Sequence, residues 1–259
     1  MERKTWPLRD LTLKVLDLPA QVAFYEAFGF HLAEKKKHQA VLTAGEGACV
    51  TLQQLANGRP RPPKTAGLFH FALLLPDRTA LGGFVRFAVR NSFHFAGAAD
   101  HLVSESLYFS DEEGNGIEVY SDRPREQWEW EGETVRMATI ALDLEELARL
   151  PGPEWGGFPP GTRLGHMHLT VSDLDPAQKF YESLELKLTS DWGAFRFLSW
   201  HGYHHHLAIN LVEGRNAAPI TPEISGLESF SIHRDSVSKV LADPNGITIS
   251  PQWMPRFIH

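Results

Sequence analysis

The chain has 259 residues, of which 42% are hydrophobic and 22% charged, and a formal net charge of −7, as in a globular protein of one or two domains. The acidic balance argues against a nucleic-acid partner, and the single cysteine, Cys49, excludes an intrachain disulfide and a cysteine-based zinc site. No stretch approaches the roughly 18 apolar residues of a membrane span, and no apolar leader is present, so we expect a cytoplasmic protein with no membrane partner.

The first predicted elements are a strand and the helix that follows it. Apolar and polar residues alternate in LTLKV (Leu11–Val15), as they do in a half-buried strand. Asp17 then begins a helix whose apolar side carries Tyr25. Three more strands complete a first module near residues 10–56, and RPRPPKT (Arg59–Thr65) is a linker.

A second module, near residues 66–122, has the same order of elements. Its first strand lies in GLFHFALLLPD (Gly67–Asp77). Its last strand follows the Asn-Gly turn of GNGIEVYSD (Gly114–Asp122), a signal of a hairpin. The segment after it carries a short predicted helix, LDLEELARL, and a Pro/Gly-rich loop, PGPEWGGFPPG.

The second half of the chain repeats the first. At a constant offset of 156 residues, LTLKVLDLPAQVAFYEAFGFHL (Leu11–Leu32) matches MHLTVSDLDPAQKFYESLELKL (Met167–Leu188). A third module therefore occupies about residues 164–213. A fourth, near 224–255, matches the second in GLESFSIHRDS and PNGITISP, but only DSVSKVLA is available for its helix, so we expect its helix or one strand to be reduced.

Four modules of one strand, one helix and three strands predict an α+β chain with two cup-shaped open mixed sheets. The N-terminal half covers residues 1–123 and contains modules one and two. Residues 124–163 form a linker with a short helix. The C-terminal half covers residues 164–259 and contains modules three and four.

The modules and four of their motifs resemble the vicinal oxygen chelate superfamily of glyoxalases, bleomycin resistance proteins and extradiol dioxygenases. The motifs are GHMHLTVSDL, GLFHFALLLPD, LVSESLYFSDEEGNGIEVY and HGYHHHLAIN, and the resemblance spans most of the chain. Within the superfamily the chain is most similar to the catechol 2,3-dioxygenase-like, ring-cleaving group. The resemblance implies an Fe(II)-dependent extradiol dioxygenase that opens a small aromatic diol with O₂. It does not identify the substrate.

The resemblance also implies a metal site. The family's ligand positions in this chain carry Thr12, His70, Glu118, His168, Ser229 and Thr248. Three of these residues can bind a metal, so the implied ligands are His70, Glu118 and His168. His166 shares a strand face with His168 and is the nearest alternative. Two histidines and one carboxylate suit Fe(II), and they also bind Mn(II) and other divalent metals.

The distribution of these ligands predicts how the modules pair. Pairing module one with two, and three with four, would separate His168 from His70 and Glu118 and leave both sites incomplete. Pairing two with three, and one with four, produces one full metal site and one site without ligands. We therefore predict this crossed pairing and a single bound metal.

The run HHHLAIN is predicted to form the last strand of module three, which crossed pairing brings to the metal site. The resemblance implies an acid–base histidine on this strand, and His205 is the best match. It would take a proton from the substrate and return one later, as an imidazole can near neutral pH. The choice among His204, His205 and His206 stays open, because neighbouring strand residues face opposite ways.

Two further catalytic residues are implied by the resemblance. Tyr108 lies ten residues before Glu118, where extradiol enzymes have a tyrosine that donates a hydrogen bond to the substrate. His101 resembles a histidine that supports it, although its spacing to Tyr108 is two residues shorter than usual. Five aromatic residues could wall a pocket: Phe69, Phe71, Trp192, Trp200 and Trp253.

Two other functions remain open from the sequence. A glyoxalase-like isomerase or a thiol transferase of the same fold uses a fourth carboxylate ligand, which neither Thr12 nor the HHHLAIN run supplies. A non-catalytic small-molecule binding protein would not need the metal ligands. The sequence leaves a homo-oligomer open.

Overall fold

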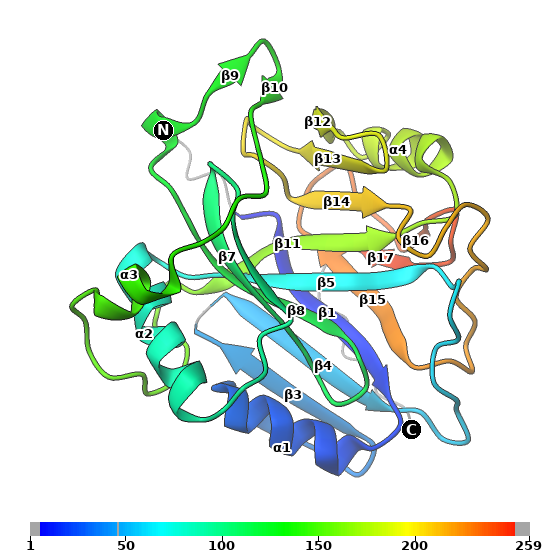
Figure 1. Ribbon diagram of the computed structural model, residues 1–259. Coiled ribbons are helices and arrows are strands. Elements are labelled where there is room, and N and C mark those ends of the chain that lie inside the picture. Colours follow the sequence, from blue (N-terminus) through cyan, green and yellow to red (C-terminus); the bar gives the residue numbers. More distant parts are fainter. Residues whose placement is uncertain (1–5, 46, 252–259) are drawn as a thin grey trace.

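The computed structural model describes residues 6–45 and 47–251, which form two large mixed sheets with helices packed against them (Figure 1). The seven-stranded sheet has the order β16-β17-β15-β1-β4-β3-β2. Its strands are β1 (Leu8–Val15), β2 (His31–Lys35), β3 (Gln39–Ala44), β4 (Ala48–Gln54), β15 (Gly226–Ile232), β16 (Leu241–Ala242) and β17 (Thr248–Ser250).

The eight-stranded sheet has the order β12-β13-β14-β11-β5-β8-β7-β6. Its strands are β5 (Gly67–Leu74), β6 (Gly97–Asp100), β7 (Ser104–Ser110), β8 (Gly116–Asp122), β11 (Arg163–Thr170), β12 (Lys187–Asp191), β13 (Phe195–Ser199) and β14 (Leu207–Asn210). The remaining elements are the hairpin of β9 (Trp130–Glu131) and β10 (Thr134–Val135), the helices α1 (Leu18–Phe28), α2 (Arg78–Arg90), α3 (Leu144–Arg149) and α4 (Leu174–Glu182), and the 3₁₀ turn η1 (Arg125–Gln127).

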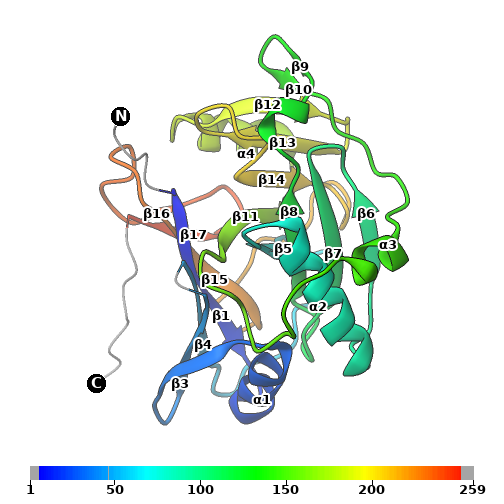
Figure 2. The same ribbon diagram turned by 90° about the vertical axis from the view of Figure 1, so that its left-hand side faces the viewer.

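The predicted crossed pairing of modules is confirmed. Strand β1 of module one lies antiparallel to β15 of module four, and β5 of module two lies antiparallel to β11 of module three. Each large sheet therefore combines strands from both halves of the chain. The two sheets appear as separate layers when the molecule is turned by 90° (Figure 2).

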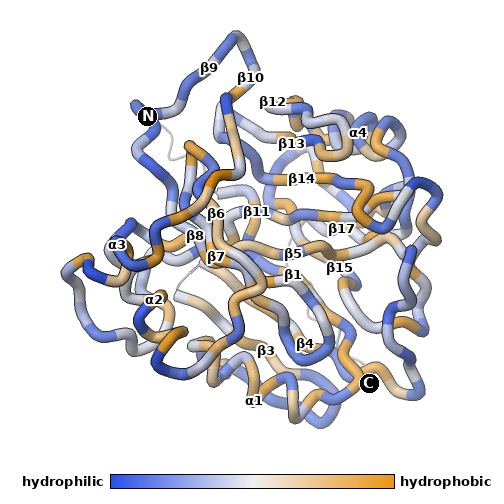
Figure 3. Tube along the Cα trace, viewed as in Figure 1, coloured by the Kyte–Doolittle hydropathy of each residue, from blue (hydrophilic) through white to orange (hydrophobic). Residues whose placement is uncertain are grey.

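Alternate residues of each central strand point to opposite sides of its sheet. Figure 3 shows the hydropathy of each residue along these strands. On β5, Phe71 and Leu73 belong to the main hydrophobic core, whereas His70 and Ala72 face the other way. On β11, Met167 and Leu169 belong to the same core. The core face holds the layers together, and the opposite face of the eight-stranded sheet is free to carry polar side chains.

Aspartates fix the start of the three long helices. The side chains of Asp17 and Asp77 accept hydrogen bonds from the backbone N–H groups of Ala20 and Ala80, and Asp173 caps α4 in a similar way. Such N-caps satisfy backbone donors that the first helical turn leaves unpaired. The 156-residue repeat thus has a structural basis, because Asp17 and Asp173 have the same role.

One prediction about the elements is confirmed and another is wrong. The segment DSVSKVLA forms no helix, and its last two residues form the short strand β16, so module four is the reduced one, as expected. The run HHHLAIN does not form a single strand, because β14 begins only at Leu207 and the three histidines precede it in bends and irregular backbone. Within the described residues, no helix is both long and apolar enough to cross a membrane.

Candidate metal and catalytic site

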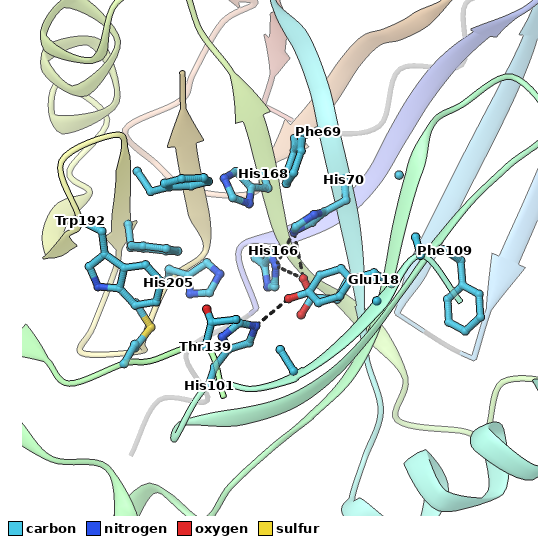
Figure 4. Close-up of a pocket in the computed structure, with 18 of the residues that line it drawn as sticks. Phe69, His70, His101, Phe109, Glu118, Thr139, His166, His168, Trp192 and His205 are labelled. Atoms are coloured by element: carbon cyan, nitrogen blue, oxygen red, sulfur yellow. Dashed lines mark hydrogen bonds and ion pairs between the residues drawn. The ribbon is translucent and has the colours of Figure 1, made fainter. Parts of the chain in front are cut away.

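A cavity of about 600 Å³ lies against the polar face of the eight-stranded sheet (Figure 4). Strands β5, β7, β8, β11 and β13 contribute to its wall, and the segment after β10 contributes Met137 and Thr139. Among its described lining residues, Glu118 is the only carboxylate, and none is a lysine or arginine. The lining is therefore poor in formal charge, and its one carboxylate lies on the side formed by β11, β5 and β8.

Three side chains with metal-binding atoms converge at this side of the cavity. His70 on β5, Glu118 on β8 and His166 on β11 are all buried, and their ligand atoms lie within 4.8 Å of one another. The Nε2 atoms of His70 and His166 lie 2.9 and 3.0 Å from Oε2 of Glu118, and 3.4 Å from each other. Three donors held about 2.1 Å from one ion at right angles are about 3.0 Å apart, so this group fits one face of an octahedral metal.

The register of the strands explains why these residues meet. Ala72 on β5 lies between His166 on β11 and Glu118 on β8 in one row across the sheet. Its methyl group leaves room above it, and the side chains on either side lean into that space. His70 faces the same way from the next row and closes the group.

The ligand set of the prediction differs from this group at one position. His168 lies directly opposite His70, with ring centroids 4.7 Å apart, and it lines the cavity. Its Nε2 atom, however, accepts a hydrogen bond from the Nδ2 group of Asn210 at 2.9 Å. The amide is fixed in that orientation because its Oδ1 atom already accepts from Thr170 and Val212. The structure thus brings His166, the alternative, into the three-residue group instead of His168.

A signal in the sequence could have found His166. His70 precedes Asp77, the N-cap of α2, by seven residues, and His166 precedes Asp173, the N-cap of α4, by the same seven residues (77 − 70 and 173 − 166). The capping aspartates fix equivalent points in the two modules. Counting from them selects His166, whereas the register in which the first strands of the modules were matched selected His168.

The electrostatics of the group favour a metal-binding state. Burial lowers the pKa of His166 and lowers that of His168 well below its ordinary value, so both rings are neutral at physiological pH. Burial also opposes ionisation of Glu118, but the interactions of the carboxyl with His166 and His70 outweigh it and hold the pKa of that carboxyl well below its usual range. Neutral imidazoles and an ionised carboxylate are the forms that bind a metal.

Of the three consecutive histidines, only His205 lines the cavity. Its ring lies 4.2 Å from that of His166, measured between centroids, and burial lowers its pKa well below the ordinary value. His204 is buried against Trp128 and Tyr203, and His206 against Trp6 and Tyr203, outside the cavity. Irregular backbone, rather than strand alternation, separates the directions of the three rings.

Tyr108 and His101 form a hydrogen-bonded pair in the cavity wall. The hydroxyl of Tyr108 lies 2.7 Å from Nε2 of His101, and Nδ1 of His101 donates to the backbone carbonyl of Ala138 at 2.7 Å. In the neutral ring, the tyrosine hydroxyl is then the donor to Nε2. Tyr108 also lies directly opposite Glu118 across β7 and β8, so the pair faces the same side of the cavity as the metal-binding group.

The predicted aromatic wall is found in part. Phe69 and Trp192 line the cavity, together with Phe195 and Phe197, which the sequence did not single out. Phe71 and Trp200 are instead buried in the hydrophobic core. Trp253 lies outside the described residues.

Comparisons with known proteins identify the family of this chain. The family model of the Glyoxalase/Bleomycin resistance protein/Dioxygenase superfamily matches residues 9–119. A protein named catechol-2,3-dioxygenase from Bacillus subtilis (strain 168) is 38% identical over 228 residues, covering 85% of this chain and 80% of the relative. The chain belongs to this superfamily. The resemblance on which the sequence prediction rested is therefore confirmed.

Solved structures of superfamily members share the fold. A putative dioxygenase from Bacillus subtilis subsp. subtilis str. 168 has a TM-score of 0.59 at 12% identity and covers 95% of this chain and 84% of its own. A glyoxalase I mutant from Zea mays has a TM-score of 0.55 at 16% identity, with 94% and 92% coverage. Both superfamily neighbours match across both halves of the chain, which confirms the predicted arrangement of two curled mixed sheets.

Proposed function

We propose that this protein is an extradiol, ring-cleaving dioxygenase that uses Fe(II) and O₂ to open a catechol-like aromatic diol. The observation that carries the proposal is the placement of all candidate groups around one apolar cavity: the group of His70, Glu118 and His166 on one wall, with His205 and the Tyr108–His101 pair beside it. The 38% identity to a protein named catechol-2,3-dioxygenase supports it independently.

His70, Glu118 and His166 would hold the metal ion. When bound, the ion would supply binding positions for a diol and O₂ and a route for electrons between them. The protein's own contribution is to fix the ligands on three adjacent strands. Because β11, β5 and β8 are paired side by side in one sheet, the ligand separation is set before a metal binds.

The residues around this centre would handle protons and orientation. His205 would accept the proton of a substrate hydroxyl as general base and return one later in the reaction. Tyr108 would donate a hydrogen bond to a substrate oxygen by turning its hydroxyl proton away from Nε2 of His101, to which it donates in the absence of substrate. The aromatic side chains of Phe69, Trp192 and Phe197 would pack against the ring and exclude water.

The nature of the cavity also indicates the kind of diol. Because its described lining contains no lysine or arginine, it offers no permanently cationic side chain to pair with a carboxylate substituent. We therefore propose a diol with apolar substituents. The isomerase and thiol-transferase alternative is less well supported, because Glu118 is the only carboxylate among the described lining residues.

The test is metal content after anaerobic reconstitution with Fe(II), followed by oxygen uptake with a panel of catechols. We expect one iron per chain, catechol-dependent oxygen uptake and a coloured ring-opened product. Glu118→Ala should lose both iron and uptake, whereas Thr248→Ala, at the corresponding position of the seven-stranded sheet, should keep both. One bound metal without oxygen uptake would contradict the dioxygenase proposal and favour the isomerase class. No bound metal would contradict the proposed ligand group.

A further inference from the structure

A chain of hydrogen bonds leads away from the cavity through His205. Nδ1 of His205 lies 2.7 Å from Nδ1 of His204, and Nε2 of His204 lies 2.9 Å from Oδ1 of Asp122. Both histidines are buried, while the side chain of Asp122 is 24% exposed. These hydrogen bonds thus connect the partly exposed carboxylate of Asp122, at the end of β8, with His205 in the cavity. The residue between them, His204, has no role in the proposed chemistry.

The chemistry of the partners fixes the direction of each hydrogen bond. A carboxylate oxygen can only accept, so Nε2 of His204 carries the proton and donates to Asp122. In a neutral ring this leaves Nδ1 of His204 as an acceptor. Two facing Nδ1 atoms at 2.7 Å need one donor and one acceptor, so His205 donates from Nδ1. Nε2 of His205 then has a free lone pair.

This order matters because only an unprotonated nitrogen can act as a base. Nδ1 of His205 is engaged by His204, so Nε2 is the nitrogen that remains available in a ring that lines the cavity. Without the carboxylate, the hydrogen bond between the two histidines would be equally stable with His204 as the donor and His205 as the acceptor. That order would place the proton on Nε2 of His205 and occupy the position that must accept a proton.

We propose that Asp122 and His204 are positioning residues that hold His205 in the tautomer with a free Nε2 lone pair in the cavity. The inference rests on the proposed function, in which His205 is the general base, and extends it to two residues outside the cavity. Carboxylates orient catalytic histidines in other enzymes through a single hydrogen bond, and here a second imidazole lies in between.

The structure supplies a matched control in Tyr203. Its hydroxyl donates to the same Oδ1 atom of Asp122 at 3.0 Å, but it lies on a branch that leads to Tyr120 instead of to His205. Tyr203→Phe therefore removes a hydrogen bond from the same carboxylate, in the same buried cluster, without breaking the chain from Asp122 to His205. Asp122→Ala and His204→Phe break that chain at its two links.

The experiment reads the tautomer of His205 directly in the metal-free protein. Long-range ¹H–¹⁵N correlation spectra of ¹⁵N-histidine-labelled protein show which ring nitrogen is protonated, and the signals of His205 are assigned by their loss in His205→Gln. We expect His205 to carry its proton on Nδ1 in the wild type and in Tyr203→Phe. In Asp122→Ala and His204→Phe, we expect the signal of a protonated Nε2 to appear.

Two results would overturn the proposal: a protonated Nε2 on His205 in the wild type, or an unchanged tautomer when Asp122→Ala and His204→Phe are folded. Thermal unfolding checks the fold of each variant, and if one fails to fold, the other decides. Since no metal, catechol or turnover is involved, failure of this test is distinct from failure of the dioxygenase proposal. In the reconstituted enzyme, Asp122→Ala should lower kcat about 10- to 100-fold with unchanged iron content, less than the 10²–10⁴-fold expected for loss of a general base.

Discussion

The two large sheets have the same construction but carry different side chains on their polar faces. In the eight-stranded sheet His168 lies opposite His70, and in the seven-stranded sheet Thr12 lies opposite Ser229 in the matching arrangement of strands. The backbone therefore does not make a metal site by itself. It makes a place where three strands bring side chains together, and the side-chain types decide whether a metal can bind.

The position that corresponds to His166 shows this difference most clearly. Seven residues before the capping Asp17 lies Asp10, a buried residue that could also be a ligand. Its Oδ2 atom accepts from the hydroxyl of Ser231 at 2.6 Å and lies 3.5 Å from Nε2 of His233. Burial raises the pKa of Asp10, and the bond from Ser231 opposes that rise. This carboxyl is thus engaged inside the sheet, whereas Glu118 faces a cavity.

The largest expected effect is on metal binding, which should depend on a residue of the eight-stranded sheet and not on its counterpart in the seven-stranded sheet. His166→Ala should abolish iron binding and lower oxygen uptake roughly 10³-fold or more, because a metal contributes several kcal/mol to the reaction. Asp10→Ala, at the corresponding position, should keep one iron per chain. His168→Ala should also keep its iron, because the Nε2 atom of His168 is bonded to Asn210. Iron analysis after reconstitution measures all three, and iron loss in His168→Ala instead of His166→Ala would reverse the assignment.

The next effect concerns the acid–base residue. His205→Gln should lower kcat about 10²–10⁴-fold while the iron content stays at one, because the general base is lost and the metal group is intact. The matched variant is His233→Gln, which removes a histidine from the seven-stranded sheet near Asp10. Steady-state oxygen uptake distinguishes them. An equal loss of rate in both variants would point to a general effect on the fold.

A third prediction compares substrates with a charged and an uncharged substituent in the cavity. A catechol with a carboxylate substituent should have a kcat/KM about 10²-fold lower than one with an alkyl substituent of similar size. The reason is that the described cavity lining has no lysine or arginine, and an unpaired buried charge costs several kcal/mol. Thr139→Arg adds a cation to the lining and should therefore reduce the difference in kcat/KM between the two substrates. A wild-type preference for the carboxylated substrate would refute the proposed substrate class.

A smaller effect should be the same in both halves of the chain. The hydroxyl of Tyr25 on α1 donates to Asp111 at 3.1 Å, and the hydroxyl of Tyr181 on α4 donates to Asp243 at 3.0 Å. Tyr25→Phe and Tyr181→Phe should each lower the free energy of unfolding by about 1–2 kcal/mol, the cost of a buried hydrogen bond to a charged group. Urea unfolding measures both values. A large difference between the two losses of unfolding free energy would show that the two repeated hydrogen bonds do not contribute equally to stability.

The smallest effect is the pH dependence of these two aspartates. Burial raises the pKa of Asp111 and of Asp243 above 3.8, so the folded chain holds these protons more tightly than the unfolded chain does. Their contribution to the free energy of unfolding should therefore increase as the pH falls from above the folded pKa toward 3.8, and then level off. Asp243→Asn should remove part of that increase. An unchanged dependence of urea midpoints on pH would contradict this assignment.

The sequence determined the fold to a large extent, because its signals are local. Alternating apolar residues define the strands and their core face, and aspartates at fixed spacing define where helices begin. The crossed pairing also followed from the sequence, since only one way of pairing the modules places two histidines and Glu118 at one site.

The tertiary structure decided which histidines meet, although the seven-residue spacing to the capping aspartates already favours His166. His166 and His168 lie on the same strand face, so alternation could not choose between them, and the choice depended on two long-range contacts. Ala72 leaves space between His166 and Glu118, and Asn210 engages His168. The directions of His204, His205 and His206 likewise depend on irregular backbone before β14 and on the position of Asp122, 82 residues away from His204 in the chain. Such contacts between distant segments exist only once the sheets have formed, and local patterns in the sequence carry no record of them.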